Sequence, residues 1–543
     1  MDPHEAYSEL IRRTRDLSYL ASTSSLLGWD EQTFMPEGGA FHRSAQMGLL
    51  AGLHHERATD PKLGELLAVV ESSDLVAEPT SPAAVNAREL RRSYNRRVRL
   101  PRTLVEDLAR TTSLAQPEWV AARTTCDFVR FRPWLEKIIQ LKRDESACLA
   151  TETPIAGKPA EAHSSHKKAP APAPPARSPY DPLLDDYEPG ANSQELATLF
   201  HALRSELVPL VATISERCRR LNHGGASTGS NQPPGGARSA ILTRFFPRAR
   251  QQVFGEAAAA AAGFDFKRGR LDVTAHPFCS GIGTGDCRIT TRYDEHNFSD
   301  AFFGILHEVG HGLYEQGLDP EHYGTPMGEA VSLGIHESQS RLWENAVARS
   351  RPFWTYWFPM ARRIFHEALS DVSLDAFHTA VNHVGPSLIR VQADELTYNL
   401  HIIVRFELEQ ALLSGDLAVA DLPAAWNQKY EEVLGLKPGN DAEGCLQDIH
   451  WSAGLIGYFP TYTLGNLYAA QLFAKAETEL GGLEEAFAHG DYESLLAWLR
   501  QKVHCEGQRR RPAELIEHIT GNKPDHRPLI ASLKRKYSEL YGT

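Results

Sequence analysis

Apolar residues recur at intervals of three and four along most of this chain, and strict alternation of apolar and polar residues is rare. From residue 7 to about 142, Leu, Ala, Arg and Glu follow the helical interval. The segments 42–57, 84–98 and 102–123 each predict an amphipathic helix, and the charged residues 492–541 predict a closing helical layer. We therefore expect a mainly α-helical protein.

One region departs from this pattern. Residues 270–274 and 286–293 alternate polar with apolar or β-branched residues, and Gly281, Gly283 and Gly285 lie between them. The pattern predicts a β-hairpin or a small sheet. It comes just before the most distinctive helix of the chain, so its extended edge could hold a peptide as an added strand.

That helix is predicted over residues 300–314. Four apolar residues form one buried face, and Ser299 or Asp300 is placed to cap its start. His307 and His311 are four residues apart and therefore lie one above the other on another face, where both imidazoles can bind one divalent metal ion. Glu308 flanks the same place and can take a proton from the water that such a site keeps. The alternative is that the two histidines are simply solvated or packed in the core.

A catalytic metal site of this kind needs a third protein ligand. Glu315 lies on the same helical face, but at about 1.5 Å of rise per residue it is roughly 12 Å along the axis from His307, too far to share an ion. Glu329 and Glu337 lie in the next predicted helix, and either is within reach on spacing alone. We favour Glu337, because Ser338, Ser340 and Arg341 around it suit hydrogen bonding to a ligand.

Composition limits the possible partners and the compartment. The chain has 543 residues, of which 42% are hydrophobic and 23% charged, as in a soluble globular protein with an ample core. The formal net charge of −12 argues against nucleic acid as a partner. The seven cysteines are scattered without CxxC spacing, which favours a reducing cytoplasm. With no apolar run of membrane-spanning length and no signal-like start, we expect neither export nor membrane insertion.

Two stretches of biased composition interrupt the helical sequence. Residues 151–178 are rich in Ala, Pro, Lys, Ser and His, and residues 224–236 are rich in Gly, Ser and Pro. Such stretches cannot bury enough apolar surface to offset their ordering entropy, so we expect disordered insertions in loops. Because helical sequence resumes after each, we predict one domain over residues 1–543.

Six ordered motifs carry a resemblance to a known family. The chain closely resembles the carboxypeptidase Taq family of metallocarboxypeptidases in residues 276–278 (HPF), 286–290 (DCRIT), 307–311 (HEVGH), 336–339 (HESQ), 389–394 (IRVQAD) and 444–451 (GCLQDIHW). The similarity extends over nearly the whole chain, and the two insertions are the departures from it.

The resemblance implies a large, mainly helical, saddle-like metallopeptidase fold with a deep groove and a small β-hairpin or sheet next to the metal helix. It implies a homodimer that removes single amino acids from the C-terminus of peptides with broad specificity. It also implies one divalent ion per chain, Zn²⁺ or alternatively Co²⁺, and it identifies Glu337 as the third metal ligand. Glu329 is then left as a hydrogen-bonding or groove residue.

A carboxypeptidase also needs groups that bind the terminal carboxylate and stabilise the oxyanion. Arg390 is the leading candidate for the carboxylate, because a guanidinium matches its two oxygens, although Arg390 could instead pair with Asp394. Arg288 is a second candidate, unless it braces Asp286. We predict Tyr398 as the oxyanion donor. His276 and His450 are predicted as further hydrogen-bond donors to substrate.

Two rival interpretations remain at this point. The chain could be an oligopeptidase or a dipeptide-releasing carboxypeptidase on a similar scaffold. It could also be a catalytically silent helical binding protein, although the joint presence of His307, Glu308, His311 and Glu337 argues against that.

Overall fold

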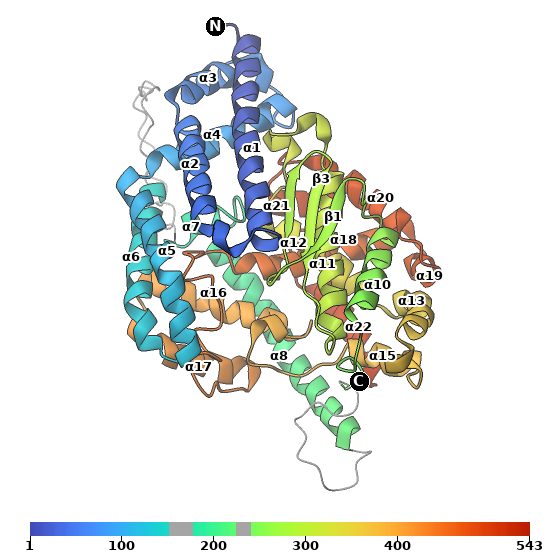
Figure 1. Ribbon diagram of the computed structural model, residues 1–543. Helices are drawn as coiled ribbons and strands as arrows, with labels where there is room; N and C mark the ends of the chain where they lie inside the picture. Colours follow the sequence, from blue (N-terminus) through green and yellow to red (C-terminus); the bar gives the residue numbers. More distant parts are fainter. Residues whose placement is uncertain (151–177, 224–239, 543) are drawn as a thin grey trace, which may run out of the picture. The chain divides into compact units, whose positions relative to one another are not determined.

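The computed structural model describes residues 1–150, 178–223 and 240–542, and helices dominate all three ranges (Figure 1). The prediction of a mainly helical protein is confirmed. Both predicted insertions, residues 151–178 and 224–236, fall almost wholly outside the described residues.

The chain forms two compact units, each assembled from segments that are distant in sequence. The larger unit comprises Met1–Arg91, Leu199–Ile403 and Pro460–Thr543, and the smaller comprises Arg92–Thr198 and Val404–Phe459. The helices α4 (Pro82–Arg99), α8 (Ser193–His223) and α16 (Tyr398–Ser414) run through the boundaries between these segments. The prediction of a single domain over residues 1–543 stays a prediction.

The larger unit holds most of the helices and the sheet. Its remaining main helices are α1 (Pro3–Thr33), α2 (Ala40–Ala58), α3 (Pro61–Glu71), α10 (Arg248–Ala261), α11 (Phe298–Gly317), α12 (Leu333–Arg341), α13 (Arg351–Ile364), α14 (His366–Leu369), α15 (Leu374–Val381), α18 (Pro460–Leu480), α19 (Leu483–Ala488), α20 (Glu493–Lys502), α21 (Pro512–Thr520) and α22 (Arg527–Tyr541). A π-helical segment, η5 (Leu342–Ala348), continues directly from α12.

The smaller unit is built around a pair of long helices. Its helices are α5 (Arg102–Thr125), α6 (Phe128–Ala150), α7 (Asp181–Leu184) and α17 (Leu422–Leu434). Helices α5 and α6 pack side by side, joined by a short turn in which Cys126 adopts a left-handed conformation.

The sheet has three strands, β1 (Gly269–Val273), β2 (Cys279–Gly283) and β3 (Asp286–Thr291), in the order β1-β3-β2. The two alternating segments found in the sequence, β1 and β3, are neighbours but run parallel, with Leu271 opposite Ile289. The hairpin is instead formed by β2 and β3, which pair antiparallel with a bulge between Gly281 and Gly283. The glycine-rich stretch between the two alternating segments is therefore an edge strand, and α1 and α11 pack against it (Figure 1).

An aromatic cluster anchors the start of α11. The rings of Phe298 and Phe302 stack with centroids 5.3 Å apart, and Phe254, Trp354 and Phe365 surround them. Such apolar packing stabilises a helix far more than its intrinsic propensity does. The helix that carries the two histidines is thus fixed at its N-terminal end by the core.

Over the described ranges, no helix combines the length and apolar character needed to cross a membrane.

Candidate metal centre

Helix α11 presents His307 and His311 away from the core. Phe302, Leu306 and Val309 are buried on its apolar face, as the spacing predicts, and both histidines are only partly exposed. The cap differs from the prediction. Asn297, rather than Ser299 or Asp300, is the N-cap, and its side chain accepts a hydrogen bond from the Asp300 N–H.

Two glycines let α12 approach closely enough to add Glu337. A Cβ at Gly310, inside the HEVGH motif, would lie 2.5 Å from the Gln339 carbonyl oxygen and 2.6 Å from Ser340 Cα. A Cβ at Gly465 of α18 would lie 2.5 Å from Glu337 Cγ. Helix α12 therefore lies in close contact with α11 at Gly310 and with α18 at Gly465. This close approach brings Glu337 near the two histidines.

The three predicted ligands converge. Glu337 Oε2 lies 3.7 Å from His307 Nε2 and 3.5 Å from His311 Nε2. Ligands about 2.0–2.2 Å from a tetrahedral ion lie roughly 3.4 Å from one another, so the donors need only small shifts to bind one ion. Among the described residues, this is the one group of three such donors close enough together to hold a metal. Two imidazoles and a carboxylate suit Zn²⁺ or a similar divalent ion.

Each histidine is oriented by a different partner. His307 Nδ1 lies 3.0 Å from Glu344 Oε2, and Glu344 is itself held by Arg341 at 3.2 Å and Arg349 at 3.1 Å. Hydrogen bonding of the distal nitrogen fixes the ring so that Nε2 points toward Glu337, where it would be available to a metal ion. Glu344 was not predicted from the sequence, although its place two helical turns after Glu337 was a usable signal.

His311 has a longer chain of partners. Its Nδ1 lies 2.6 Å from His336 Nδ1, and His336 Nε2 lies 2.8 Å from Glu315 Oε1. Glu315 in turn packs over strand β2, where a Cβ at Gly281 would lie 2.2 Å from its Oε2. Glu315 lies outside the group of three donors and ends a hydrogen-bonded chain that leads through His336 to His311.

Glu337 is held as an anion. It accepts hydrogen bonds from Arg341 Nε at 2.7 Å and from Ser340 Oγ at 3.1 Å. Burial opposes its ionisation, but Arg341 and the two histidines outweigh this effect and hold its pKa well below the usual range. These are the neighbours, Ser340 and Arg341, on which the sequence-based choice of Glu337 rested.

The two histidines differ in their affinity for a proton. Burial lowers the pKa of His311 to about 3, so its imidazole is neutral and ready to ligate. Burial acts on His307 in the same direction, but the carboxylates of Glu337 and Glu344 outweigh it and raise the His307 pKa. A metal ion would take the place of the proton on His307.

Glu308 combines burial with an unused oxygen. Its side chain is 6% exposed, and Oε2 has no hydrogen-bond partner within the part of the chain that the structure describes. Burial raises the pKa of Glu308 to about 7, against the attraction of His307. A carboxylate with this pKa can both accept and release a proton near neutral pH.

Comparisons with known proteins place the chain in a family. The chain matches the family described as carboxypeptidase Taq (M32) metallopeptidase over residues 9–155 and 162–537. It belongs to that family. The predicted resemblance is confirmed, and the chain is an enzyme of the metallocarboxypeptidase class.

Individual relatives match from end to end. The chain is 48% identical to thermostable carboxypeptidase 1 of Thermus thermophilus over 542 residues, and 35% identical to carboxypeptidase 1 of Bacillus subtilis over 542 residues; each alignment covers 100% of both chains. The crystal structure of an M32 carboxypeptidase from Deinococcus radiodurans superposes with a TM-score of 0.88 at 40% identity, covering 99% of this chain and 100% of that one.

In this M32 chain, Arg390 and Tyr398 are linked to Glu337 through Arg341. Arg390 is buried and its Nη1 donates to the Tyr398 hydroxyl at 3.0 Å. The guanidinium of Arg341, which binds Glu337, stacks on the Tyr398 ring at 4.5 Å. One tyrosine therefore separates Arg390 from the arginine that holds the third ligand. The alternative partner, Asp394, accepts backbone N–H groups from Gly385, Leu396 and Thr397.

The other predicted substrate residues lie in different surroundings. Arg288 binds Asp286 through two hydrogen bonds of 2.9 and 2.8 Å and stacks on Trp29 at 4.1 Å. This is the alternative role considered for Arg288, in which it braces Asp286.

The two histidines and Glu329 lie elsewhere. His276 is exposed. His450 belongs to the smaller unit, where its ring packs on Phe459 with centroids 4.4 Å apart. Glu329 is exposed and lies outside the ligand cluster.

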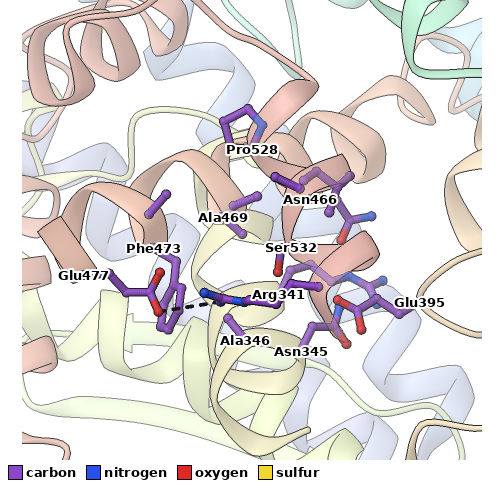
Figure 2. Close-up of a pocket in the computed structure, with 15 residues that line it drawn as sticks. Arg341, Asn345, Ala346, Glu395, Asn466, Ala469, Phe473, Glu477, Pro528 and Ser532 are labelled. Carbon is purple, nitrogen blue, oxygen red and sulfur yellow. Dashed lines mark ion pairs between the residues drawn. The ribbon is translucent and has the colours of Figure 1, made fainter. Parts of the chain in front are cut away.

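A cavity of about 290 Å³ opens beside Arg341 (Figure 2). Asn345, Asn466 and Phe473 are among the residues that line it, and an ion pair of 3.7 Å joins Glu477 to Arg535. None of the three ligands lines this cavity. A second cavity of about 200 Å³ follows strand β2 and is lined by Gly281, Gly283 and Glu315, so it is the one connected to the metal centre through His336.

Proposed function

We propose that this enzyme removes single amino acids from the free C-terminus of peptides, with broad specificity. His307, His311 and Glu337 would hold one divalent ion, with zinc expected and cobalt as the alternative. When bound, the ion would polarise the scissile carbonyl and activate water. The single observation that carries the proposal is the unpartnered, buried oxygen of Glu308 beside three convergent metal donors.

In this proposal, Glu308 acts as the general base and then as the acid. Its pKa of about 7 suits both tasks, because it can take a proton from the attacking water and return it to the leaving amine. Its burial keeps bulk water from competing for that oxygen. The neighbouring His307 and Glu344 hold the metal side of the site in place.

The substrate would be oriented by residues around this centre. We assign the terminal carboxylate to Arg390 and the oxyanion to Tyr398, whose hydroxyl accepts a hydrogen bond from Arg390 and whose ring contacts Arg341, the partner of Glu337. The cavity along the edge strand β2 offers a place for the peptide backbone. Arg288, His276 and His450 remain candidates for further contacts with substrate. The homodimeric state and the cytoplasmic location, which follow from the family resemblance and the scattered cysteines, are part of the same proposal.

The test is a product ladder from purified enzyme. An N-terminally blocked peptide should lose one residue at a time by mass spectrometry, and the same peptide with an amidated C-terminus should stay uncut, because amidation removes the charge assigned to Arg390. Release of two residues at once would support the dipeptide-releasing alternative, and internal cuts would support an oligopeptidase.

The base is tested by Glu308→Gln. We expect turnover to fall about a thousandfold while metal content stays near one ion per chain. Glu321→Gln, an exposed glutamate on the 3-10 turn Pro320–His322, is the matched control and should keep full activity. Substantial residual activity in the Glu308 variant would refute the assignment.

A further inference from the structure

Two of the seven cysteines lie side by side next to the metal helix. Cys279 on β2 and Cys287 on β3 have sulfur atoms 3.7 Å apart. Cys287 is 3% exposed, whereas Cys279 is partly exposed, so the pair is protected but reachable from one side.

Both thiols face α11. In the antiparallel β2–β3 pair, Gly281 is opposite Cys287 and Cys279 is opposite Ile289, so the two cysteines are diagonal neighbours. Side chains two apart on a strand share a face. Gly281 on this face is covered by Glu315 of α11, and Ile289 contacts α11 at Gly312, where a Cβ would lie 3.2 Å from its Cγ2.

The spacing of the sulfur atoms fits a chelated metal ion. Two thiolates about 2.3 Å from a tetrahedral Zn²⁺ ion lie roughly 3.8 Å apart, close to the 3.7 Å seen here, and a larger soft ion such as Cd²⁺ needs only a slightly wider separation. A disulfide would need the sulfur atoms about 2.05 Å apart, and diagonal neighbours in a sheet are roughly 7–8 Å apart at Cα, beyond the usual range for a disulfide. The pair is thus better placed to chelate than to oxidise.

We propose that Cys279 and Cys287 form a dithiol site for a thiophilic divalent cation such as Cd²⁺, distinct from the His307, His311 and Glu337 cluster. Binding replaces two S–H bonds by two metal–sulfur bonds and releases two protons to solvent, so the charge balances. Soft ions favour thiolates, whereas Mg²⁺ and Ca²⁺ favour oxygen ligands and should not bind here.

The local charges support this selectivity. Contact with the Cys287 thiol, together with burial, raises the pKa of Cys279, and the carboxylates of Glu315 and Glu308 act in the same direction. Only an ion with a strong preference for sulfur can displace protons from such a pair. The same carboxylates attract a cation toward it.

The experiment is a titration of the metal-loaded enzyme with Cd²⁺ under a phosphine reductant. We expect one additional Cd²⁺ per chain, an ultraviolet charge-transfer band of the cadmium–thiolate bond, and retention of the original catalytic metal. Cys279→Ser and Cys287→Ser should each weaken this binding at least about tenfold, since each removes one arm of the chelate. Cys505→Ser, at an exposed cysteine far along the chain, is the control and should leave the band unchanged.

A second measurement does not depend on variants. Bound Cd²⁺ should protect Cys279 and Cys287 of the unaltered protein from alkylation, as mapped by mass spectrometry, while Cys505 stays reactive. Cadmium uptake that releases the catalytic metal without a thiolate band, or equal affinity in the two serine variants and the parent protein, would overturn the proposal.

Discussion

Two buried glutamates, one in each compact unit, differ in their affinity for a proton. Glu337 in the metal centre is 7% exposed and is held by Arg341 at 2.7 Å and by Ser340. Glu409 in the smaller unit is fully buried and accepts hydrogen bonds from Tyr180 Oη at 2.7 Å, Trp451 Nε1 at 2.8 Å and the Gly457 N–H at 3.1 Å. One has a cation in direct contact, and the other is surrounded mainly by neutral donors.

The difference appears in their affinity for protons. Burial raises the pKa of Glu409 to about 7, because its neutral donors only partly compensate for lost hydration. The pKa of Glu337 is held far below normal although it too is buried, since Arg341 and two histidines stabilise the anion. In the smaller unit, Arg405 donates to Asp448 at 2.6 Å. The placement of fixed cations, rather than burial, therefore separates a glutamate that can ligate metal from one with a structural role.

The sharpest test of this comparison is Glu337→Gln. The variant loses the ligand charge and leaves Arg341 without its main partner, so metal affinity should fall about a thousandfold or more and peptidase activity should be lost. Competition with a chelator followed by metal analysis measures the change. Affinity within tenfold of the parent enzyme would show that Glu337 is not a ligand.

The next largest effect is expected for Glu409→Gln, which should change how the free energy of unfolding depends on pH. A carboxyl whose pKa is raised from 4.5 to about 7 by folding contributes stability below pH 4.5, and this contribution is lost as pH rises through about 7. The full change is about 3 kcal/mol. An amide does not titrate, so the variant should gain stability relative to the parent protein between pH 5 and pH 8.

Denaturant unfolding of both proteins across this pH range measures the effect. Glu337 should act with the opposite sign, because its lowered pKa gives stability above pH 4.5 that is lost only as pH falls below that value. A constant difference between the Glu409 variant and the parent protein would mean that Glu409 is ionised throughout.

A smaller effect tests the partners of the ligands. Nδ1 of His307 contacts the carboxylate of Glu344, whereas Nδ1 of His311 contacts His336. His336→Leu should therefore remove the group that orients His311 and leave His307 unaffected. We expect metal affinity to fall about 10- to 100-fold. His336→Asn, whose amide can take the place of Nδ1, should recover part of the loss. Equal affinity in the two variants would reduce His336 to a packing role.

Much of the metal centre could be predicted because His307, Glu308 and His311 are close together in the sequence. The four-residue spacing places His307 and His311 on one helical face, and the apolar positions of α11 determine which face is buried. The same spacing excluded Glu315 as a ligand. The small sheet was also predicted from alternation, but its pairing was not, because β1 and β3 run parallel and the glycine-rich β2 joins as the edge strand.

Local patterns in the sequence thus predicted most of the helices, two of the three strands and the helix that carries the two histidines, and the motifs indicated the family. Which side chains meet between elements could be seen only in the folded chain. Glu337 reaches the site because Gly310 and Gly465 admit α12 at close range, and Cys279 meets Cys287 because of the strand register. The physical reason is that helical periodicity is written in neighbouring residues, whereas close approach depends on side-chain volumes in segments far apart along the chain.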